Sequence, residues 1–269
     1  MNLRILSDIH IELVNDGHEF IKSFIPNEPS NNVLVLAGDI GNPSSKLYET
    51  FLTEISKYYA KVFIITGNHE YYQGYTRNVH ETKITSYRHS MEQIDEMVKN
   101  ICGKLHNVHF LQRNSVVYNR VRFIGCTLWS HGESYLAIGM HDYVYIQDMT
   151  VEKSNSLHEH DVEWLEQQLS MEPVEFDSTV VITHHLPTLK LIATQYKNHP
   201  LNCFFATDLD YLVEAADIWI CGHSHCANHI TIGNCRCYLN PAGCPNEKTG
   251  YNPELTVEIP LIKDDKNIN

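Results

Sequence analysis

The sequence predicts an α/β fold, because apolar runs typical of buried strands alternate with segments of helical spacing in the first half of the chain. Five apolar runs end directly at a short polar cluster. Asp, His and Asn are poor strand-interior residues, so their repeated placement just beyond strand ends indicates a function. In an open α/β sheet, ligands bind outside the carboxyl ends of the strands. In chain order the clusters are Asp8-Ile9-His10, Gly38-Asp39, Gly67-Asn68-His69-Glu70, Thr183-His184-His185 and Gly222-His223-Ser224-His225.

Strands account for most of the short apolar runs. They are rich in Val, Ile, Phe and Tyr and are bounded by Gly, Asn, Asp or Pro, which is the usual pattern of strands separated by turns. The runs that precede the five clusters are expected to be buried. We expect strands at 3–6, 33–37, 62–66, 108–110, 116–118, 121–125, 179–183, 217–221, 229–232, 235–239 and 254–259.

Three segments have helical spacing. Apolar side chains recur every three or four residues from Leu47 to Tyr59, which predicts an amphipathic helix. A longer and more polar stretch predicts a helical insertion at about 76–103. The third helix is expected at 154–169, with His158 and His160 facing solvent.

The chain shows no internal repeat and no low-complexity linker, so we expect a single domain over residues 1–262. Residues 263–269 are a polar C-terminal tail. Hydrophobic residues make up 43% of the chain and charged residues 20%, which fits a globular enzyme with a substantial core.

The charge balance bears on possible partners. The formal net charge is -13, whereas a protein that grips a nucleic-acid backbone is expected to present a basic surface. We therefore do not expect nucleic acid as a partner, although bound divalent cations would make a local site positive. No apolar run approaches about 18 residues, so no membrane span is expected. The first strand begins close to Met1, leaving no room for a signal sequence, so we expect a cytoplasmic protein with reduced cysteines.

The polar clusters contain the donors that hard and borderline divalent metals prefer. Asp8 and His10 stand two residues apart at a strand end, and Asp39 has two carboxylate oxygens that can hold two cations. Asn68 offers a carbonyl oxygen, and the later clusters offer imidazole nitrogens. Each cluster alone is a weak signal, but five in order indicate a multi-metal site.

At this point the sequence resembles the calcineurin-like metallophosphoesterase superfamily, whose blocks read DxH, GD, GNH(E/D), H and GHxH. The resemblance spans residues 8–225 and implies a four-layer αββα sandwich, in which helices flank two mixed sheets. It also implies two divalent ions, with Mn, Fe, Zn or Co suiting the donors. By the family pattern, one ion takes Asp8, His10, Asp39 and His225, and the other takes Asp39, Asn68, His184 and His223.

Two positions of the pattern stay open. His184 and His185 are adjacent, and His184 is favoured as the ligand because it directly follows the strand and Thr183. His185 then lies behind the ligands or faces substrate. By the resemblance, His69 protonates the leaving oxygen or stabilises the charge that develops at phosphorus, while the alternative is that it only caps the turn.

The chemistry implied is phosphoester hydrolysis by a metal-bridging hydroxide. The protein Ser/Thr phosphatase branch reads GDxVDRG in its second block, and its second Asp supports the catalytic His. Asn42 replaces that Asp here and no Arg follows, so that branch is disfavoured and the partner that orients His69 is open.

We expect small phosphoesters as substrates, and phosphodiesters in preference, because no Arg or Lys accompanies the blocks to hold the second charge of a monoester. The segment His141-Asp142-Tyr143 resembles a stretch of small microbial members, which makes Asp142 and Tyr143 candidates for substrate contact. A loop packed by aromatic residues explains it equally well. The alternatives are a phosphomonoesterase of the same fold, a metal-dependent nuclease and a non-catalytic binding module.

Overall fold

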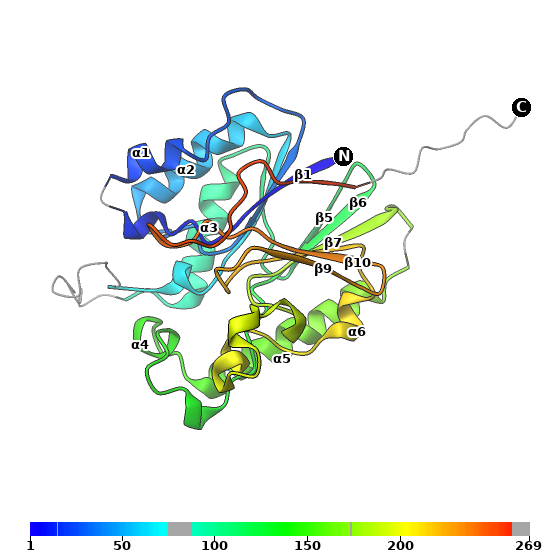
Figure 1. The fold of residues 1–269 in the computed structure, drawn as a ribbon. Coiled ribbons are helices and arrows are strands. Elements are labelled where there is room, and N and C mark those ends of the chain that lie inside the picture. Colours follow the sequence, from blue (N-terminus) through cyan, green and yellow to red (C-terminus); the bar gives the residue numbers. More distant parts are fainter. Residues whose placement is uncertain (15, 75–87, 173, 260–269) are drawn as a thin grey trace, which may run out of the picture.

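Two mixed β-sheets pack face to face, and helices cover the outer face of each sheet (Figure 1). The computed structural model describes residues 1–14, 16–74, 88–172 and 174–259. The four-layer αββα arrangement expected from the resemblance is confirmed. The expected polar tail and the first part of the expected helical insertion lie outside the described residues.

The first sheet is built mainly from the N-terminal part of the chain. It contains β1 (Asn2–Leu6), β2 (Val33–Ala37), β3 (Lys61–Ile65), β4 (Val108–Phe110) and β11 (Thr256–Glu258). The spatial order is β11-β1-β2-β3-β4, with β11 antiparallel to β1 and the other pairs parallel. Because the parallel strands run in one direction, their polar clusters emerge at one edge.

The second sheet uses the middle and the end of the chain. It contains β5 (Asn114–Tyr118), β6 (Val121–Gly125), β7 (Ser178–Ile182), β8 (Ile218–Cys221), β9 (Asn228–Ile232) and β10 (Cys235–Leu239). The order is β5-β6-β7-β8-β10-β9, with antiparallel pairs at both ends and parallel pairs between them. The clusters that follow β7 and β8 are therefore neighbours.

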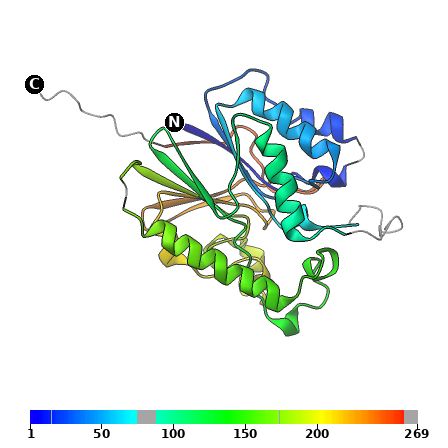
Figure 2. The same cartoon turned by 180° about the vertical axis from the view of Figure 1, so that it is seen from behind.

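Helices α1 (Gly17–Lys22), α2 (Lys46–Ile55) and α3 (Met91–Gly103) lie over the first sheet, and α5 (Val151–Leu169) and α6 (Asp210–Val213) lie over the second (Figures 1 and 2). The short α4 (Asp142–Tyr145) stands beside the edge that carries the clusters. The central core is one cluster of buried apolar side chains that comes from strands of both sheets. It includes Leu3, Ile5, Val33, Val35, Phe63, Ile65, Phe123, Val180, Ile182, Ile218 and Ile220.

Two helix predictions needed correction. The segment predicted from Leu47 to Tyr59 is helical only to Ile55, where a 3₁₀ turn at Ser56–Tyr58 takes over. His158 was expected to face solvent, but it is 6% exposed and its Nδ1 bonds the Trp129 carbonyl oxygen. The buried face of α5 includes polar residues, so the spacing of apolar residues alone does not predict it. The residues of this face are Val151, Ser154, His158, Asp161 and Leu165.

Candidate metal centre

The loops after β1 and β2 are fastened to each other by main-chain hydrogen bonds. The Asp8 N–H donates to the Gly38 oxygen at 3.0 Å, and the His10 N–H donates to the Asp39 oxygen at 3.0 Å. These bonds hold Asp8, His10 and Asp39 in the left-handed region, with φ of 52°, 50° and 54°. Such conformations cost on the order of 1–3 kcal/mol per residue and cluster at functional sites. His223 and His225 share the same strained conformation, with φ of 67° and 47°.

Gly67 is required by the close approach of two predicted ligands, Asp39 and His184. A Cβ atom there would lie 2.3 Å from Asp39 Oδ1 and 2.6 Å from His184 Nε2, closer than real Cβ contacts. Any larger residue would push apart side chains that belong to two different sheets. The glycine that precedes Asn68 therefore makes room for the site.

The predicted ligands converge on two neighbouring positions. Asp8, His10 and Asp39 bring one donor atom each within 4.8 Å of one another, and so do Asp39, His184 and His223. Asp39 belongs to both groups, as a bridging carboxylate would. Its Oδ2 lies 3.3 Å from His184 Nε2 and 3.9 Å from His10 Nε2.

The remaining predicted ligands complete the two groups. His225 Nε2 lies 3.5 Å from Asp8 Oδ1 and 3.0 Å from His10 Nε2. Asn68 Oδ1 lies 3.1 Å from His184 Nε2. The structure thus brings all the predicted ligands together, in the partition that the family pattern implies.

Each of the four imidazoles uses its outward nitrogen to donate to an acceptor. His10 Nδ1 lies 3.3 Å from Glu12 Oε1, and His225 Nδ1 lies 2.6 Å from Glu247 Oε2. His184 Nδ1 and His223 Nε2 instead bond main-chain oxygens, of Ala37 at 2.8 Å and of Phe204 at 3.2 Å. Such partners fix the tautomer and leave the other nitrogen as a lone-pair donor pointing inward, as metal ligation requires.

Asn68 is oriented in the same way. Its Nδ2 donates to Asp142 Oδ1 at 2.8 Å and to the Tyr72 hydroxyl at 3.0 Å, and that hydroxyl donates to Asp142 at 2.6 Å. The amide nitrogen is therefore committed outward, and the Oδ1 atom faces the site. Asp142 thus holds a predicted ligand in place, a function that the sequence did not suggest.

The electrostatics of the site favour bound cations. Burial raises the pKa of Asp8, but the hydrogen bond and charge of His225 outweigh it and lower the pKa to about 2. Burial lowers the pKa of His184, but the charge and bond of Asp39 outweigh it and raise the pKa to about 9. Asp8 and Asp39 thus stay ionised beside inward-facing imidazole nitrogens that would exchange their protons for cations, and this donor set fits two divalent ions.

Glu70 clamps the second and third clusters together. Its carboxylate accepts the main-chain N–H groups of Asp39 at 2.9 Å, Ile40 at 2.7 Å and Gly67 at 2.7 Å. The residue is fully buried on the 3₁₀ turn His69–Tyr71. Glu70 therefore fixes the loops that carry Asp39 and Asn68 to each other.

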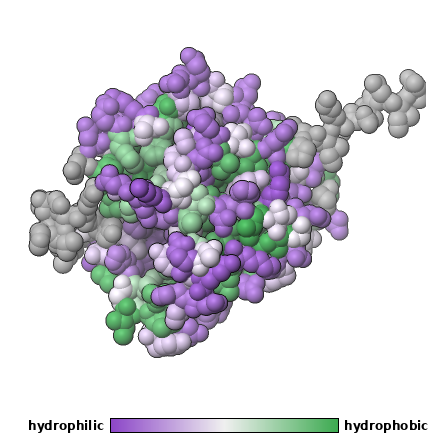
Figure 3. Space-filling model, viewed as in Figure 1, coloured by the Kyte–Doolittle hydropathy of each residue, from purple (hydrophilic) through white to green (hydrophobic). Residues whose placement is uncertain are grey.

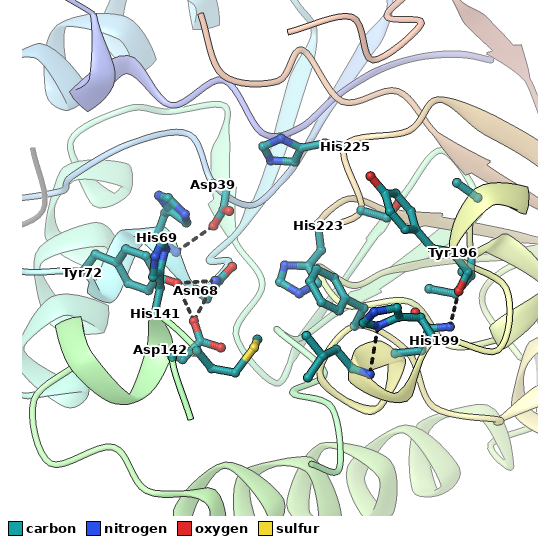
Figure 4. A pocket seen from close by; sticks show the side chains of 18 residues that line it. Asp39, Asn68, His69, Tyr72, His141, Asp142, Tyr196, His199, His223 and His225 are labelled. Atoms are coloured by element: carbon teal, nitrogen blue, oxygen red, sulfur yellow. Dashed lines mark hydrogen bonds between the residues drawn. The ribbon is translucent and has the colours of Figure 1, made fainter. Parts of the chain in front are cut away.

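His69 lies beside the two groups and faces the cavity (Figure 4). Its ring stacks on Tyr72 with centroids 4.2 Å apart, and its main-chain N–H donates to Asp39 Oδ1 at 2.8 Å. The Nδ1 atom lies 3.1 Å from Glu12 Oε1. The catalytic histidine predicted from the resemblance is thus held from three sides.

The three candidates for substrate contact lie in different surroundings. Asp142 lines the cavity, whereas Tyr143 and His185 lie outside its lining. The Tyr143 hydroxyl bonds Ser154 Oγ at 3.1 Å, and His185 stacks behind His223 with centroids 4.0 Å apart. His185 is 2% exposed, so it supports a predicted ligand from behind.

A cavity of about 520 Å³ opens in front of the predicted ligands. One wall carries His69, Tyr72 and Asp142, and the facing wall carries Tyr196 and His199 (Figure 4). The stretch of chain that carries Tyr196 and His199 also contributes apolar lining residues, which we call the apolar wall: Ile192, Ala193, Leu201 and Phe205. Figure 3 shows hydrophobic residues gathered at the lower left of the face it draws, near α4, where Tyr135, Ile138 and Val144 are exposed.

All eight cysteines lie in the described part of the chain and are free, as expected. Cys244 belongs to a feature that the sequence did not indicate. It lies in the loop that also supplies Glu247, and its thiol is within 4.8 Å of the His10 and His225 nitrogens. The C-terminal loop thus contributes to the site beyond the five clusters.

Comparison with known proteins identifies the family. A profile of the calcineurin-like phosphoesterase family matches residues 1–227. The chain belongs to this family. It is therefore a metallophosphoesterase, a hydrolase of phosphoric esters in a family that depends on two metal ions.

Individual relatives are more distant. Uncharacterized protein L509 of Acanthamoeba polyphaga mimivirus is 27% identical over 284 residues, which cover 96% of each chain. The crystal structure of phosphopantetheinyl hydrolase from Mycobacterium tuberculosis matches with a TM-score of 0.69 and 17% identity, over 91% of this chain and 90% of that one. A dimetal phosphatase from Danio rerio matches with a TM-score of 0.46 and 12% identity, over 91% and 88%. Within the ranges that the structure describes, no helix of the calcineurin-like phosphoesterase is both long and apolar enough to span a membrane.

Proposed function

We propose that the protein hydrolyses small phosphodiesters with two divalent metal ions, taken from Mn, Fe, Zn or Co. Asp8, His10, Asp39 and His225 would hold one ion, and Asp39 would share the second with the ligands after β3, β7 and β8. The bound ions supply an activated water and a clamp on the phosphoryl oxygens. The ligands after β3, β7 and β8 are Asn68, His184 and His223.

His69 is proposed as the general acid. Its Nδ1–H donates to Glu12, so the ring presents Nε2 as its second proton-carrying atom. As the bond between phosphorus and the leaving oxygen breaks, the Nε2 proton passes to that oxygen, which avoids expelling a free alkoxide. Stacking on Tyr72 keeps the ring in this position.

The preference for diesters rests on the lining of the cavity. Among the described residues, none that lines it is Lys or Arg. A monoester carries a second negative charge near neutral pH, which proteins usually neutralise with such cations. A diester carries one charge and adds an organic group, for which the apolar wall provides uncharged surface.

Hydrolysis assays with Mn²⁺ test the proposal. We expect kcat/KM for bis(para-nitrophenyl) phosphate to exceed that for para-nitrophenyl phosphate by at least about tenfold, the effect of about 1.4 kcal/mol. Faster cleavage of the monoester would overturn the diester preference. Esters that carry a phosphopantetheinyl group belong in the substrate panel, because a fold neighbour is named for hydrolysing such a group.

Two variants distinguish hydrolysis at the proposed metal centre from hydrolysis by a contaminating activity. Asp39→Asn removes the shared carboxylate and should abolish hydrolysis, whereas Asp177→Asn changes a surface aspartate that pairs with Arg120 and should leave the rate unchanged. Equal rates for wild type and Asp39→Asn would mean that the site is not catalytic.

A further inference from the structure

Asn42, three residues after Asp39, does not serve as the partner of His69. Asn42 stands where the protein phosphatase branch has its supporting Asp. Its Oδ1 accepts the Ser44 N–H at 2.8 Å, so Asn42 caps a turn at the start of α2. The side chain that orients His69 is therefore to be sought at another position in the fold.

Glu12 occupies that position. Its Oε1 lies 3.1 Å from His69 Nδ1 and 3.3 Å from His10 Nδ1, so one oxygen accepts from both rings. The two rings contact edge to face, with centroids 4.3 Å apart. The Glu12 side chain is only 12% exposed, which limits competition from water for these bonds.

The local backbone fixes the position of Glu12. It lies at the centre of the 3₁₀ turn Ile11–Leu13, and both flanking side chains are buried. Gly41 leaves the space for this turn, because a Cβ atom at Gly41 would lie 2.3 Å from Ile11 Cγ1 and 3.2 Å from Glu12 Oε2. A side chain at residue 41 would displace Glu12 from His69.

We propose that Glu12 is a positioning residue for His69: it fixes the Nδ1–H tautomer and aims Nε2 at the leaving oxygen, while its second bond ties His69 to the metal ligand His10. This proposal rests on the proposed function, in which His69 donates a proton to the leaving group. The link means that the general acid and one predicted ion site share a single oxygen atom. A carboxylate that only supported His10 would have no effect on leaving-group protonation.

Leaving-group dependence tests the role. Glu12→Gln keeps the size of the side chain and removes the charge. For a diester with a benzyl leaving group, which needs protonation, we expect kcat to fall about 10- to 100-fold, as for other residues that orient catalytic groups. For the matched para-nitrophenyl ester, which leaves without a proton, the fall should be within about threefold. Equal losses for both esters would overturn the proposal.

Three controls keep this result interpretable. Glu19→Gln changes an exposed glutamate on α1 and should match wild type. In a His69→Asn background, Glu12→Gln should cause no further loss with the benzyl ester, and additive losses would contradict the proposal. At saturating Mn²⁺, Glu12→Gln and His69→Asn should both retain two bound metal ions by elemental analysis, and loss of one ion in Glu12→Gln would mean that its lower kcat reports the support of His10 instead of leaving-group protonation.

A spectroscopic readout is independent of activity. The His69 Nδ1–H proton, identified by its loss in His69→Asn, should resonate downfield in the NMR spectrum of the wild-type protein. It should move upfield or disappear by exchange in Glu12→Gln. An unchanged resonance would overturn the proposal even if hydrolysis failed. Should Asp39→Asn prove as active as wild type, the proposed function fails first, and this NMR comparison still tests the bond.

Discussion

The four predicted imidazole ligands fall into two pairs that the protein supports differently. The carboxylate-backed pair, His10 and His225, bonds the side chains of Glu12 and Glu247. The carbonyl-backed pair, His184 and His223, bonds main-chain oxygens of Ala37 and Phe204. A carboxylate adds negative charge and raises the basicity of the ligand, whereas a carbonyl oxygen is neutral and positioned by the backbone. A single side-chain substitution can therefore change the basicity of the carboxylate-backed imidazoles. The carbonyl-backed imidazoles depend on the position of the backbone instead.

The largest expected effect comes from breaking the carbonyl-backed pair. His184→Asn should lower kcat/KM on the order of 10³-fold, because a ligand contributes several kcal/mol of transition-state stabilisation. His185→Asn is the matched control. Its ring stacks on His223 and its Nδ1 bonds Ser130 Oγ, both behind the predicted ligands, so a loss within about tenfold is expected. A larger loss in His185→Asn than in His184→Asn would reverse the ligand assignment.

A smaller effect should come from the carboxylate-backed pair. Glu247→Gln keeps an acceptor for His225 Nδ1 but removes the charge, so the affinity for one Mn²⁺ should fall about 10- to 100-fold. The other ion should bind as in wild type, and Glu54→Gln on α2 should change neither affinity. Calorimetric titration of the metal-free protein measures both affinities. An equal loss for both ions would mean that the pairs are not independent.

The smallest expected effect is a change in the thermal stability of the metal-free protein. In that protein two of the predicted imidazole ligands, His10 and His184, bind protons instead of metal ions. The charges of Asp39 and Glu12, with their hydrogen bonds, outweigh burial and raise the folded-state pKa values of His184 and His10 to about 9, above the usual 6.5. A raised pKa in a base contributes stability that is complete below pH 6.5 and is lost as the pH rises through about 9. The Tm of chelator-treated protein should therefore fall by several degrees across this interval. A flat or rising Tm would contradict the assigned charges.

The strands and the site blocks could be predicted from sequence because their signals are local. An apolar run followed by Asp, Asn or His at a strand end is readable without knowing what packs on it, as at Asp8, Asp39 and Asn68. The structure places these residues together because parallel strands share one edge.

The supporting roles of Asp142 and Glu12 were missed because the partners of both residues are distant in sequence. Asp142 contacts Asn68 across 74 positions, and Glu12 contacts His69 across 57. Glu12 did carry one local signal, since it follows His10 by two residues. His158 carried another, since α5 repeats its buried face every three or four residues even where the members are polar.

The Glu70 clamp has a consequence for how readily the site accepts its ions. Three main-chain N–H groups from two loops are bonded to one buried carboxylate, so the loops that carry Asp39 and Asn68 are ordered before any ion arrives. Freezing a backbone residue costs about 1–2 kcal/mol of conformational entropy. Because the bonds to Glu70 order these loops during folding, ion binding does not have to order them. Less of the attraction between the donor atoms and the cations is then offset by lost entropy, and the affinity for the ions is higher.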